Sequence, residues 1–134
     1  MIIPAIRYRD PEAALLFLVG VLGLDEHAVR RDDDGAFLHA ELRLGDGLVS
    51  IRGLAGQGRP AAPPADPDGG AGPGSMTIYA VVPDPAHLHA RVLEAGAQIV
   101  APLSGEGPGG SAFSVADPEG HVWTFGSYNP LSRD

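Results

Sequence analysis

An internal repeat of 74 residues is the feature that most constrains the fold of this chain. The dipeptide Asp10-Pro11 recurs as Asp84-Pro85, and in both places it follows a strand-like run and precedes a helix-forming stretch. Asp at the N-cap with Pro at the first helical position is a typical helix start. Three strand-like runs follow each predicted helix. The sequence therefore predicts one strand, helix, strand, strand, strand unit that is used twice.

Runs rich in β-branched and aromatic residues predict eight strands, and the two capped stretches predict helices. Strands are expected over residues 2–8, 24–31, 37–45, 47–53, 76–82, 97–103, 111–117 and 121–128, and helices over 9–23 and 83–96. Gly, Pro and Ala dominate the segment between the two units, which favours a solvated linker, with a lid over a binding site as the alternative. We expect a single α+β domain over residues 1–134, with module 1 at 1–52, a linker at 53–75 and module 2 at 76–128.

Charge and composition exclude several classes of function. The net charge is −8, and nine arginines with no lysine provide no basic stripe for nucleic acid. Without cysteine the chain has no disulfide, thiol nucleophile or zinc–thiolate site. The N-terminal residues lack the pattern of a signal peptide, and no apolar run approaches the roughly 20 residues of a membrane span. We therefore expect a cytoplasmic protein that binds neither nucleic acid nor membrane.

The Asp46-Gly47 pair predicts a tight hairpin that fixes the faces of the two adjoining strands. A two-residue turn at this pair would place Glu41 opposite Arg52. One face then carries the apolar side chains that a helix should cover. The other face suits either a pocket or plain exposure to solvent, and it carries a mixed set of residues: Phe37, His39, Glu41, Arg43, Leu48, Ser50 and Arg52.

The segment SVADPEGHVWTFGSY, residues 114–128, contains Asp117, Glu119 and His121, three side chains that could mark acid/base or metal chemistry. The order Asp, Pro, Glu, Gly over residues 117–120 is, however, typical of a type I turn between two strands. We interpret Glu119 and His121 as solvated residues at the tip of a hairpin. Three further histidines are interpreted as surface residues: His27, His87 and His89.

The doubled unit, the segment YRDPEAALLFL and the closing DPEGHVWTF resemble the vicinal oxygen chelate superfamily. This superfamily includes glyoxalase I, extradiol dioxygenases, fosfomycin-modifying enzymes and bleomycin-binding resistance proteins. The resemblance covers nearly the whole chain. It implies that each βαβββ module forms a four-stranded, mostly antiparallel sheet curled into half a barrel, and that paired halves enclose a ligand cleft, often within a dimer. It does not imply one activity, because members isomerise, open rings, add thiols or bind drugs.

The resemblance also implies where a metal site would lie. Catalytic members place His, Gln or Glu on the first and last strands of each unit, and these positions map here to Ile3, Ser50, Thr77 and Thr124. The repeat supports the mapping, because Ile3 and Thr77, like Ser50 and Thr124, are 74 residues apart. A hydrocarbon and three hydroxyl groups do not replace imidazole and carboxylate ligands. We therefore expect neither a metal ion nor another cofactor.

Other residues on the same faces could bind a ligand. Arg7 lies where glyoxalase I uses an arginine to hold an acidic substrate, although a salt bridge with Glu41 is an equal alternative. His39 and Glu41 could act as base and acid or hold a metal, and an ion pair between Glu41 and Arg52 is the simpler interpretation. The full set of expected ligand-binding residues is Arg7, Phe37, His39, Glu41, Ser50, Arg52, Thr77, Tyr79, Thr124 and Tyr128.

Three functions remain open at this point. We expect a metal-free, small-molecule binding protein that resembles the drug-sequestering, bleomycin-resistance branch and acts as a homodimer. The alternative is a glyoxalase-like lyase, isomerase or dioxygenase with an unorthodox metal site, or with His39 or Glu41 as a metal-free general base. A third possibility is a protein-interaction subunit with a vestigial cleft. The sequence names no ligand and leaves catalysis undecided.

Overall fold

The computed structural model describes residues 1–53, 76–105 and 110–132, and their order of elements confirms the predicted repeat. Most of the predicted linker, residues 54–75, lies outside the described ranges. Module 1 contains β1 (Ala5–Tyr8), α1 (Pro11–Gly20), β2 (Asp25–Arg31), β3 (Phe37–Leu44) and β4 (Gly47–Gly53). Module 2 contains β5 (Thr77–Val81), α2 (Pro85–Glu94), β6 (Gln98–Ser104), β7 (Ala112–Ala116) and β8 (Val122–Gly126).

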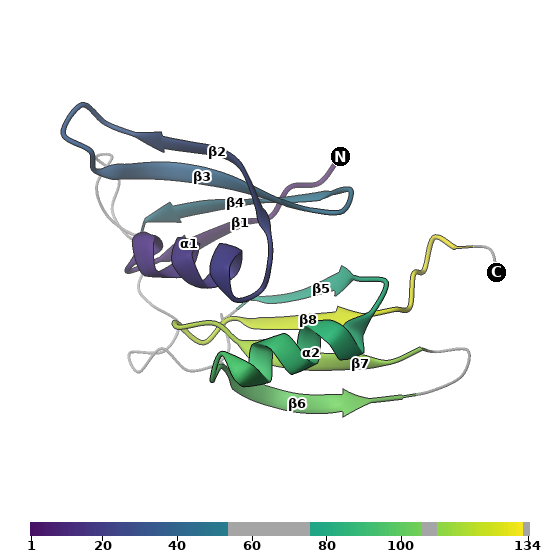
Figure 1. Ribbon diagram of the computed structural model, residues 1–134. Helices are drawn as coiled ribbons and strands as arrows, with labels where there is room; N and C mark the ends of the chain where they lie inside the picture. The colour runs from purple at the N-terminus through teal and green to yellow at the C-terminus, as the bar shows by residue number, and fades with distance from the viewer. Residues whose placement is uncertain (54–75, 106–109, 133–134) are drawn as a thin grey trace.

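The strands form two separate four-stranded sheets that do not close into a barrel (Figure 1). Sheet 1 has the order β1-β4-β3-β2, and sheet 2 has the equivalent order β5-β8-β7-β6. Only the β1–β4 and β5–β8 pairs are parallel, so both sheets are mostly antiparallel, as predicted. The repeat extends to the strand register, because Ala5 pairs with Ser50 and, 74 residues further along, Tyr79 pairs with Thr124.

Both helices begin as the sequence predicts. The Asp10 side chain accepts a hydrogen bond from the backbone N–H of Ala13 at 3.1 Å, and Asp84 accepts one from the N–H of His87 at 3.1 Å. These bonds satisfy donors that the first helical turn leaves without an intrahelical partner. Helix α2 ends before Gly96, whose φ of 79° is a left-handed value that favours glycine. No helix in the described ranges is long and apolar enough to cross a membrane.

Each helix packs on one face of its own sheet, and the apolar side chains of that face form the core. On sheet 1 the residues Ile6, Ala40, Leu42 and Ile51 are completely buried. Sheet 2 contributes a second buried group: Phe113, Val115, Trp123 and Phe125. Burying one large apolar side chain stabilises a fold by about 1.5–3 kcal/mol. Because side chains alternate along each strand, the intervening side chains point to the opposite face of the sheet.

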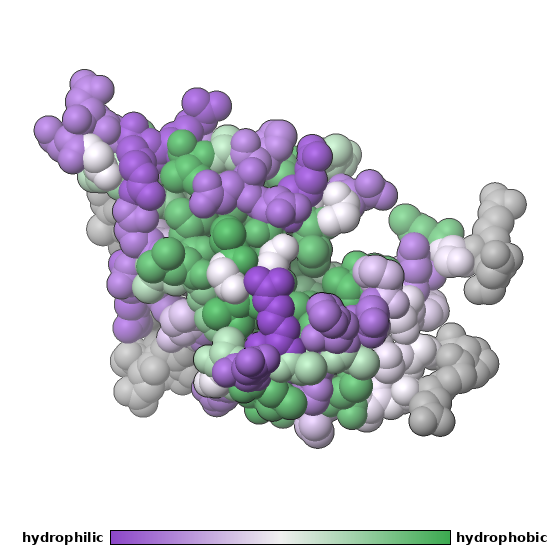
Figure 2. Space-filling view, in the orientation of Figure 1, coloured by the Kyte–Doolittle hydropathy of each residue, from purple (hydrophilic) through white to green (hydrophobic). Residues whose placement is uncertain are grey.

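Helix α1 is apolar on nearly every side, unlike an ordinary amphipathic surface helix. Its inner side buries Ala14, Leu15 and Leu18 against the sheet. On its outer side Leu16 remains 75% exposed. Figure 2 shows apolar residues gathered over α1, whereas hydrophilic residues follow β2 and the turn after it. The outer side of α1 is therefore an exposed apolar surface.

A buried carboxylate joins the two modules. Asp117 is 5% exposed, and its Oδ2 atom accepts hydrogen bonds from the Tyr8 hydroxyl at 2.5 Å and from the Trp123 indole N–H at 3.2 Å. Its Oδ1 atom accepts the backbone N–H groups of Glu119 and His121, both at 3.0 Å. Burial raises the pKa of the Tyr8 phenol far above its usual range, and the charge of Asp117 raises it further. Tyr8 is therefore a hydrogen-bond donor to module 2.

The predicted solvation of Glu119 and His121 is wrong, although the turn itself is confirmed. The Glu119 carboxylate accepts the backbone N–H groups of Arg9 at 2.7 Å and Asp10 at 2.8 Å, at the entrance to α1. The His121 ring lies edge-on to the ring of Tyr8, with 5.2 Å between the centroids, and its Nδ1 accepts the backbone N–H of Met76 at 3.1 Å. The turn therefore has a structural role as the joint between the modules.

Candidate functional site

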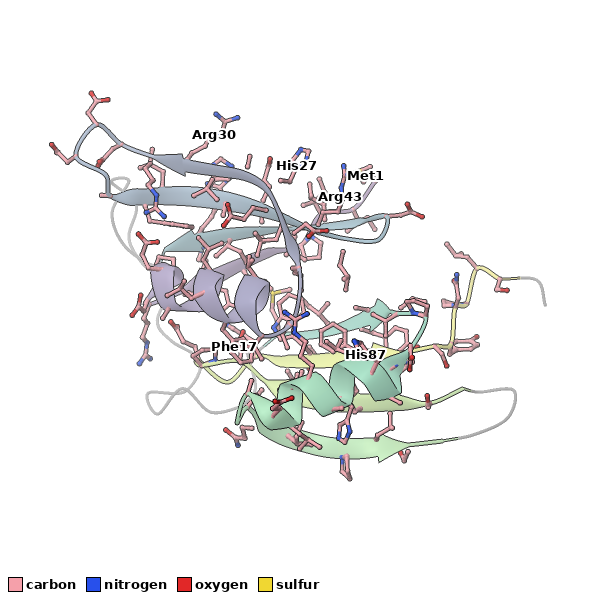
Figure 3. The ribbon with its side chains drawn as sticks, viewed as in Figure 1. Met1, Phe17, His27, Arg30, Arg43 and His87 are labelled. Atoms are coloured by element: carbon pink, nitrogen blue, oxygen red, sulfur yellow. The ribbon has the colours of Figure 1, made fainter. Side chains whose placement is uncertain are left out.

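The candidate site consists of the sheet faces that no helix of the described chain covers, which we call the helix-free faces. Arg7 lies on the helix-free face of sheet 1, because its neighbours Ile6 and Tyr8 are buried on the opposite face. His39 and Arg52 lie there for the same reason, since each adjoins a completely buried residue. Figure 3 shows Arg30 and Arg43 projecting from sheet 1 on the side away from α1.

The predicted hairpin register was wrong by two residues. The turn is formed by Gly45 and Asp46, and Gly45 has a φ of 57° that a residue other than glycine rarely adopts. Leu44 therefore pairs with Gly47, and His39 instead of Glu41 pairs with Arg52. The faces are nevertheless as predicted, because a shift of two residues in pairing does not change which side chains point up or down.

Phe37 does not lie with the other predicted ligand-binding residues. Arg30 pairs with His39 and Arg31 pairs with Phe37, so β3 advances two residues where β2 advances one. This β-bulge turns Phe37 to the opposite face, where it packs against the core. The guanidinium carbon of Arg31 lies over the Phe37 ring, 5.9 Å from the ring centroid, and Arg31 forms an ion pair with Glu12 of α1. The structure therefore gives Phe37 a packing role.

His39 and Glu41 are neighbours on the helix-free face of sheet 1. The Nε2 atom of His39 lies 3.9 Å from a carboxylate oxygen of Glu41, and the two side chains are 18% and 33% exposed. Neither Arg7 nor Arg52 forms an ion pair or a side-chain hydrogen bond with another described residue, which contradicts the expected pairing of Glu41 with Arg52. Ser50, which pairs with Glu41, is 9% exposed.

The helix-free face of sheet 2 combines hydroxyl groups with an aromatic ring. Thr124 and Ser114 are partners across β7 and β8, and their hydroxyl oxygens lie 2.7 Å apart. On the other edge of β8, Thr124 pairs with Tyr79 of β5, and Thr77 lies two residues before Tyr79 on the same strand. Ser114 was not predicted as a site residue. The predicted turn at Asp117 pairs β7 with β8, and this pairing places Ser114 opposite Thr124.

Tyr79 is held across the end of sheet 2. Its hydroxyl donates a hydrogen bond to the carbonyl oxygen of Tyr128 at 2.7 Å, while 44% of the residue remains exposed. A methyl group added at Gly126 would lie 2.5 Å from the hydroxyl oxygen of Tyr79, so the ring passes directly over this glycine. Tyr128 follows the end of β8 and is 52% exposed. Two aromatic rings are therefore available to an apolar ligand at this edge.

The remaining histidines have different environments. His27 and His87 are exposed, as predicted. The surface prediction for His89 was wrong, because it lies three residues before the buried Val92 on α2 and shares the inner side of the helix. Its ring is edge-on to Phe113, with 5.1 Å between the centroids, and its buried Nε2 atom has no hydrogen-bond partner among the described residues.

The residues at the four family metal positions do not fit a divalent metal ion. The hydrocarbon at Ile3 offers no donor atom, and Ser50, Thr77 and Thr124 offer only neutral hydroxyl groups. His39 and Glu41 provide two donors, but the described residues contain no group of three or more His, Cys, Asp or Glu side chains that could hold a metal. No step of a metal-dependent reaction can therefore be assigned to these side chains.

Comparisons with known proteins agree with this architecture. The family model of the glyoxalase/bleomycin resistance protein/dioxygenase superfamily matches residues 3–125. TioX from Micromonospora sp. ML1 is a similar solved structure, with 29% identity and a TM-score of 0.72 over 96% of this chain and 100% of that one. The bleomycin-binding protein from Streptomyces verticillus, complexed with copper(II)-bleomycin, has 23% identity and a TM-score of 0.63 over 96% and 95%. No curated protein matches the sequence.

Proposed function

We propose that this chain, which belongs to the glyoxalase/bleomycin resistance protein/dioxygenase superfamily, is a small-molecule binding protein that works without a metal ion. The observation that carries the proposal is the composition of the helix-free faces. They offer arginine side chains, paired hydroxyl groups and an exposed aromatic ring, and their family metal positions hold no imidazole or carboxylate. Such groups recognise a ligand by hydrogen bonds and stacking.

The bleomycin-binding structure supports this proposal by analogy. That protein shares the fold and is complexed with copper(II)-bleomycin, so the fold can hold a small molecule of this kind. For the present chain we propose a related role in antibiotic resistance, in which binding lowers the free concentration of an antibiotic. The aromatic edge formed by Tyr79 and Tyr128 would supply the apolar contacts.

We further propose that the ligand cleft is completed by a second copy of the chain. In the described part of the chain the two sheets remain separate, and no helix covers the helix-free face of either sheet. Leu16 on α1 and Val81 on β5 are also exposed, at 75% and 41%. A homodimer would cover such apolar surface and turn an open sheet into a lined pocket. Light scattering at micromolar concentration should give twice the chain mass of 13.8 kDa.

A thermal-shift screen against natural-product antibiotics tests the binding proposal. A ligand at about 100 times its Kd adds about 2.7 kcal/mol of stability, which raises the Tm of a domain of this size by roughly 10 °C. Tyr79→Ala should raise the Kd of the ligand at least tenfold, whereas Tyr79→Phe retains the ring and should keep the Kd within about threefold of the wild-type value. Turnover of the bound compound would overturn the proposal, and so would equal affinities in both variants.

A metal-free enzyme is a second candidate, favoured by the 3.9 Å separation of His39 and Glu41. His39 could accept a proton from a substrate while Glu41 orients the ring or stabilises its charge. This candidate requires turnover that His39→Ala abolishes. A ligand that binds both wild type and His39→Ala without chemical change excludes it.

A further inference from the structure

The observed strand register brings four basic side chains into one row across sheet 1. Arg7 of β1 pairs with Arg52 of β4, Arg52 pairs with His39 of β3, and His39 pairs with Arg30 of β2. Partners in a sheet point to the same face, and here it is the helix-free face. Neighbouring strands lie about 4.8 Å apart, so the row extends for roughly 14 Å. We call these four residues the basic row.

The basic row contrasts with the charge of the chain as a whole. The protein carries a net charge of −8, yet the helix-free face of sheet 1 presents four arginines, namely Arg7, Arg30, Arg43 and Arg52, against the carboxylates of Asp25 and Glu41. Asp25 is the cross-strand partner of Arg43, which lies outside the row. The Glu41 carboxylate on the same face lies 3.9 Å from His39.

Within the described part of the chain, no side chain pairs with the three guanidinium groups of the row to balance their charge. Arg7, Arg30 and Arg52 form no ion pair or side-chain hydrogen bond with any other described residue. Arg7 and Arg52 are direct cross-strand neighbours, an arrangement in which like charges repel and destabilise the sheet. An arrangement that opposes folding in this way is typical of a site that becomes favourable only when a ligand is bound.

We propose that the basic row is an oxyanion site, which holds a carboxylate or phosphate group of the ligand between Arg7 and Arg52. The proposal rests on the binding function proposed above and adds the chemical class of its ligand. Each guanidinium presents a planar fork of N–H donors that matches two oxygens of a carboxylate or phosphate. His39 offers a further donor beside Arg52, and Arg30 extends the positive potential along the row.

Nuclear magnetic resonance titrations with phenyl phosphate, benzoate and uncharged benzamide, in about 150 mM salt, test the site. Phenyl phosphate or benzoate should give saturable shifts in the backbone amides around Arg7 and Arg52, and benzamide should give none. Saturation by one probe but not the other identifies the preferred oxyanion. Equal shifts with benzamide, or no saturation with either anion, would overturn the proposal.

Variants distinguish a built site from a generally positive surface. Arg52→Gln and Arg7→Gln should each weaken anion binding at least tenfold, because each removes one fork. Arg43→Gln is the matched control on the same face, and it should change the Kd less than twofold. Without ligand, Arg52→Gln should raise the Tm by relieving repulsion from Arg7, whereas Arg43→Gln should not, because Arg43 lies opposite Asp25. Equal effects of Arg52→Gln and Arg43→Gln on anion affinity would contradict the proposal.

Two further outcomes separate this inference from the binding function. If an uncharged antibiotic binds while benzoate and phenyl phosphate do not, the oxyanion site is wrong and the binding function stands. If the anions bind but the protein transforms its ligand, the oxyanion site stands and the binding function is wrong. Light scattering adds a third test, because conversion of a dimer to a monomer in Arg52→Gln would show that the row holds a partner chain and overturn the ligand site.

Discussion

Replacing Asp117 with alanine should destabilise the protein more than any change at an exposed turn. The side chain accepts four hydrogen bonds, and two of the donors, the Tyr8 hydroxyl and the Trp123 indole N–H, belong to residues that are 0% and 1% exposed. A buried donor left without an acceptor costs about 1–3 kcal/mol. Leaving both of these donors without an acceptor should therefore lower the free energy of unfolding by about 2–6 kcal/mol, a large part of the stability of an ordinary domain.

Urea unfolding followed by fluorescence measures this loss directly, because the chain contains one tryptophan and it is a partner of Asp117. The matched control is Asp46→Ala in the β3–β4 turn, where the residue is exposed and makes no side-chain hydrogen bond to a described residue. This control should change the free energy of unfolding by less than about 0.5 kcal/mol.

The Asp117→Asn variant separates the turn from the joint between modules. Its remaining oxygen can still accept the backbone N–H groups of Glu119 and His121, while its amide group presents donors to the Trp123 indole N–H. We expect a loss between those of the alanine variant and the control. If Asp117→Ala lies within about 1 kcal/mol of Asp46→Ala, the buried joint does not contribute to stability and the argument is refuted.

Three other perturbations test neighbouring parts of the structure. Above pH 10 the free energy of unfolding should fall by up to about 1.4 kcal/mol per pH unit because of Tyr8. Burial and the charge of Asp117 raise the pKa of Tyr8 in the folded protein, so only the unfolded chain releases the phenol proton. The Tyr8→Phe variant should lack this pH dependence in alkaline unfolding curves, and equal slopes for variant and wild type would contradict the prediction. Gly126→Ala should displace the Tyr79 ring, whose hydroxyl lies 2.5 Å from the added methyl group, and unchanged Tyr79 ring resonances would show that the contact is absent. Glu119→Ala should lower the free energy of unfolding by about 1–3 kcal/mol, because it removes the acceptor of the Arg9 and Asp10 N–H groups. A loss below about 0.5 kcal/mol in urea unfolding would show that Glu119 does not stabilise the joint between the modules.

The features predicted from the sequence are those that local chemistry determines. Asp10 and Asp84 act as helix caps because a short side chain reaches the N–H three residues ahead, whatever the rest of the chain does. Gly96 ends α2 because of its own backbone conformation. The faces of β3 and β4 were predicted despite a wrong register, since side chains alternate with a period of two and the error was two residues.

The features that sequence reasoning missed depend on contacts between distant residues or on irregular strands. The Asp117 carboxylate accepts a hydrogen bond from Tyr8, which lies 109 positions away in the sequence, and no local pattern around either residue predicts this contact. The bulge near Phe37 reverses the face of one aromatic residue, and no Gly or Pro in β3 marks it. The basic row depends on the pairing of Arg52 with both Arg7 and His39, which became visible only once the strand register was known.

Native mass spectrometry of the purified protein, before and after incubation with zinc, nickel, manganese or iron(II), tests the central claim most directly. One spectrum reports the oligomeric state, any retained ligand and the number of metal ions per chain. The account predicts a dimer of twice 13.8 kDa that binds no metal ion stoichiometrically. About one metal ion per chain, lost in His39→Ala, would contradict it, because removing one of so few ligands abolishes most of the affinity of a metal site.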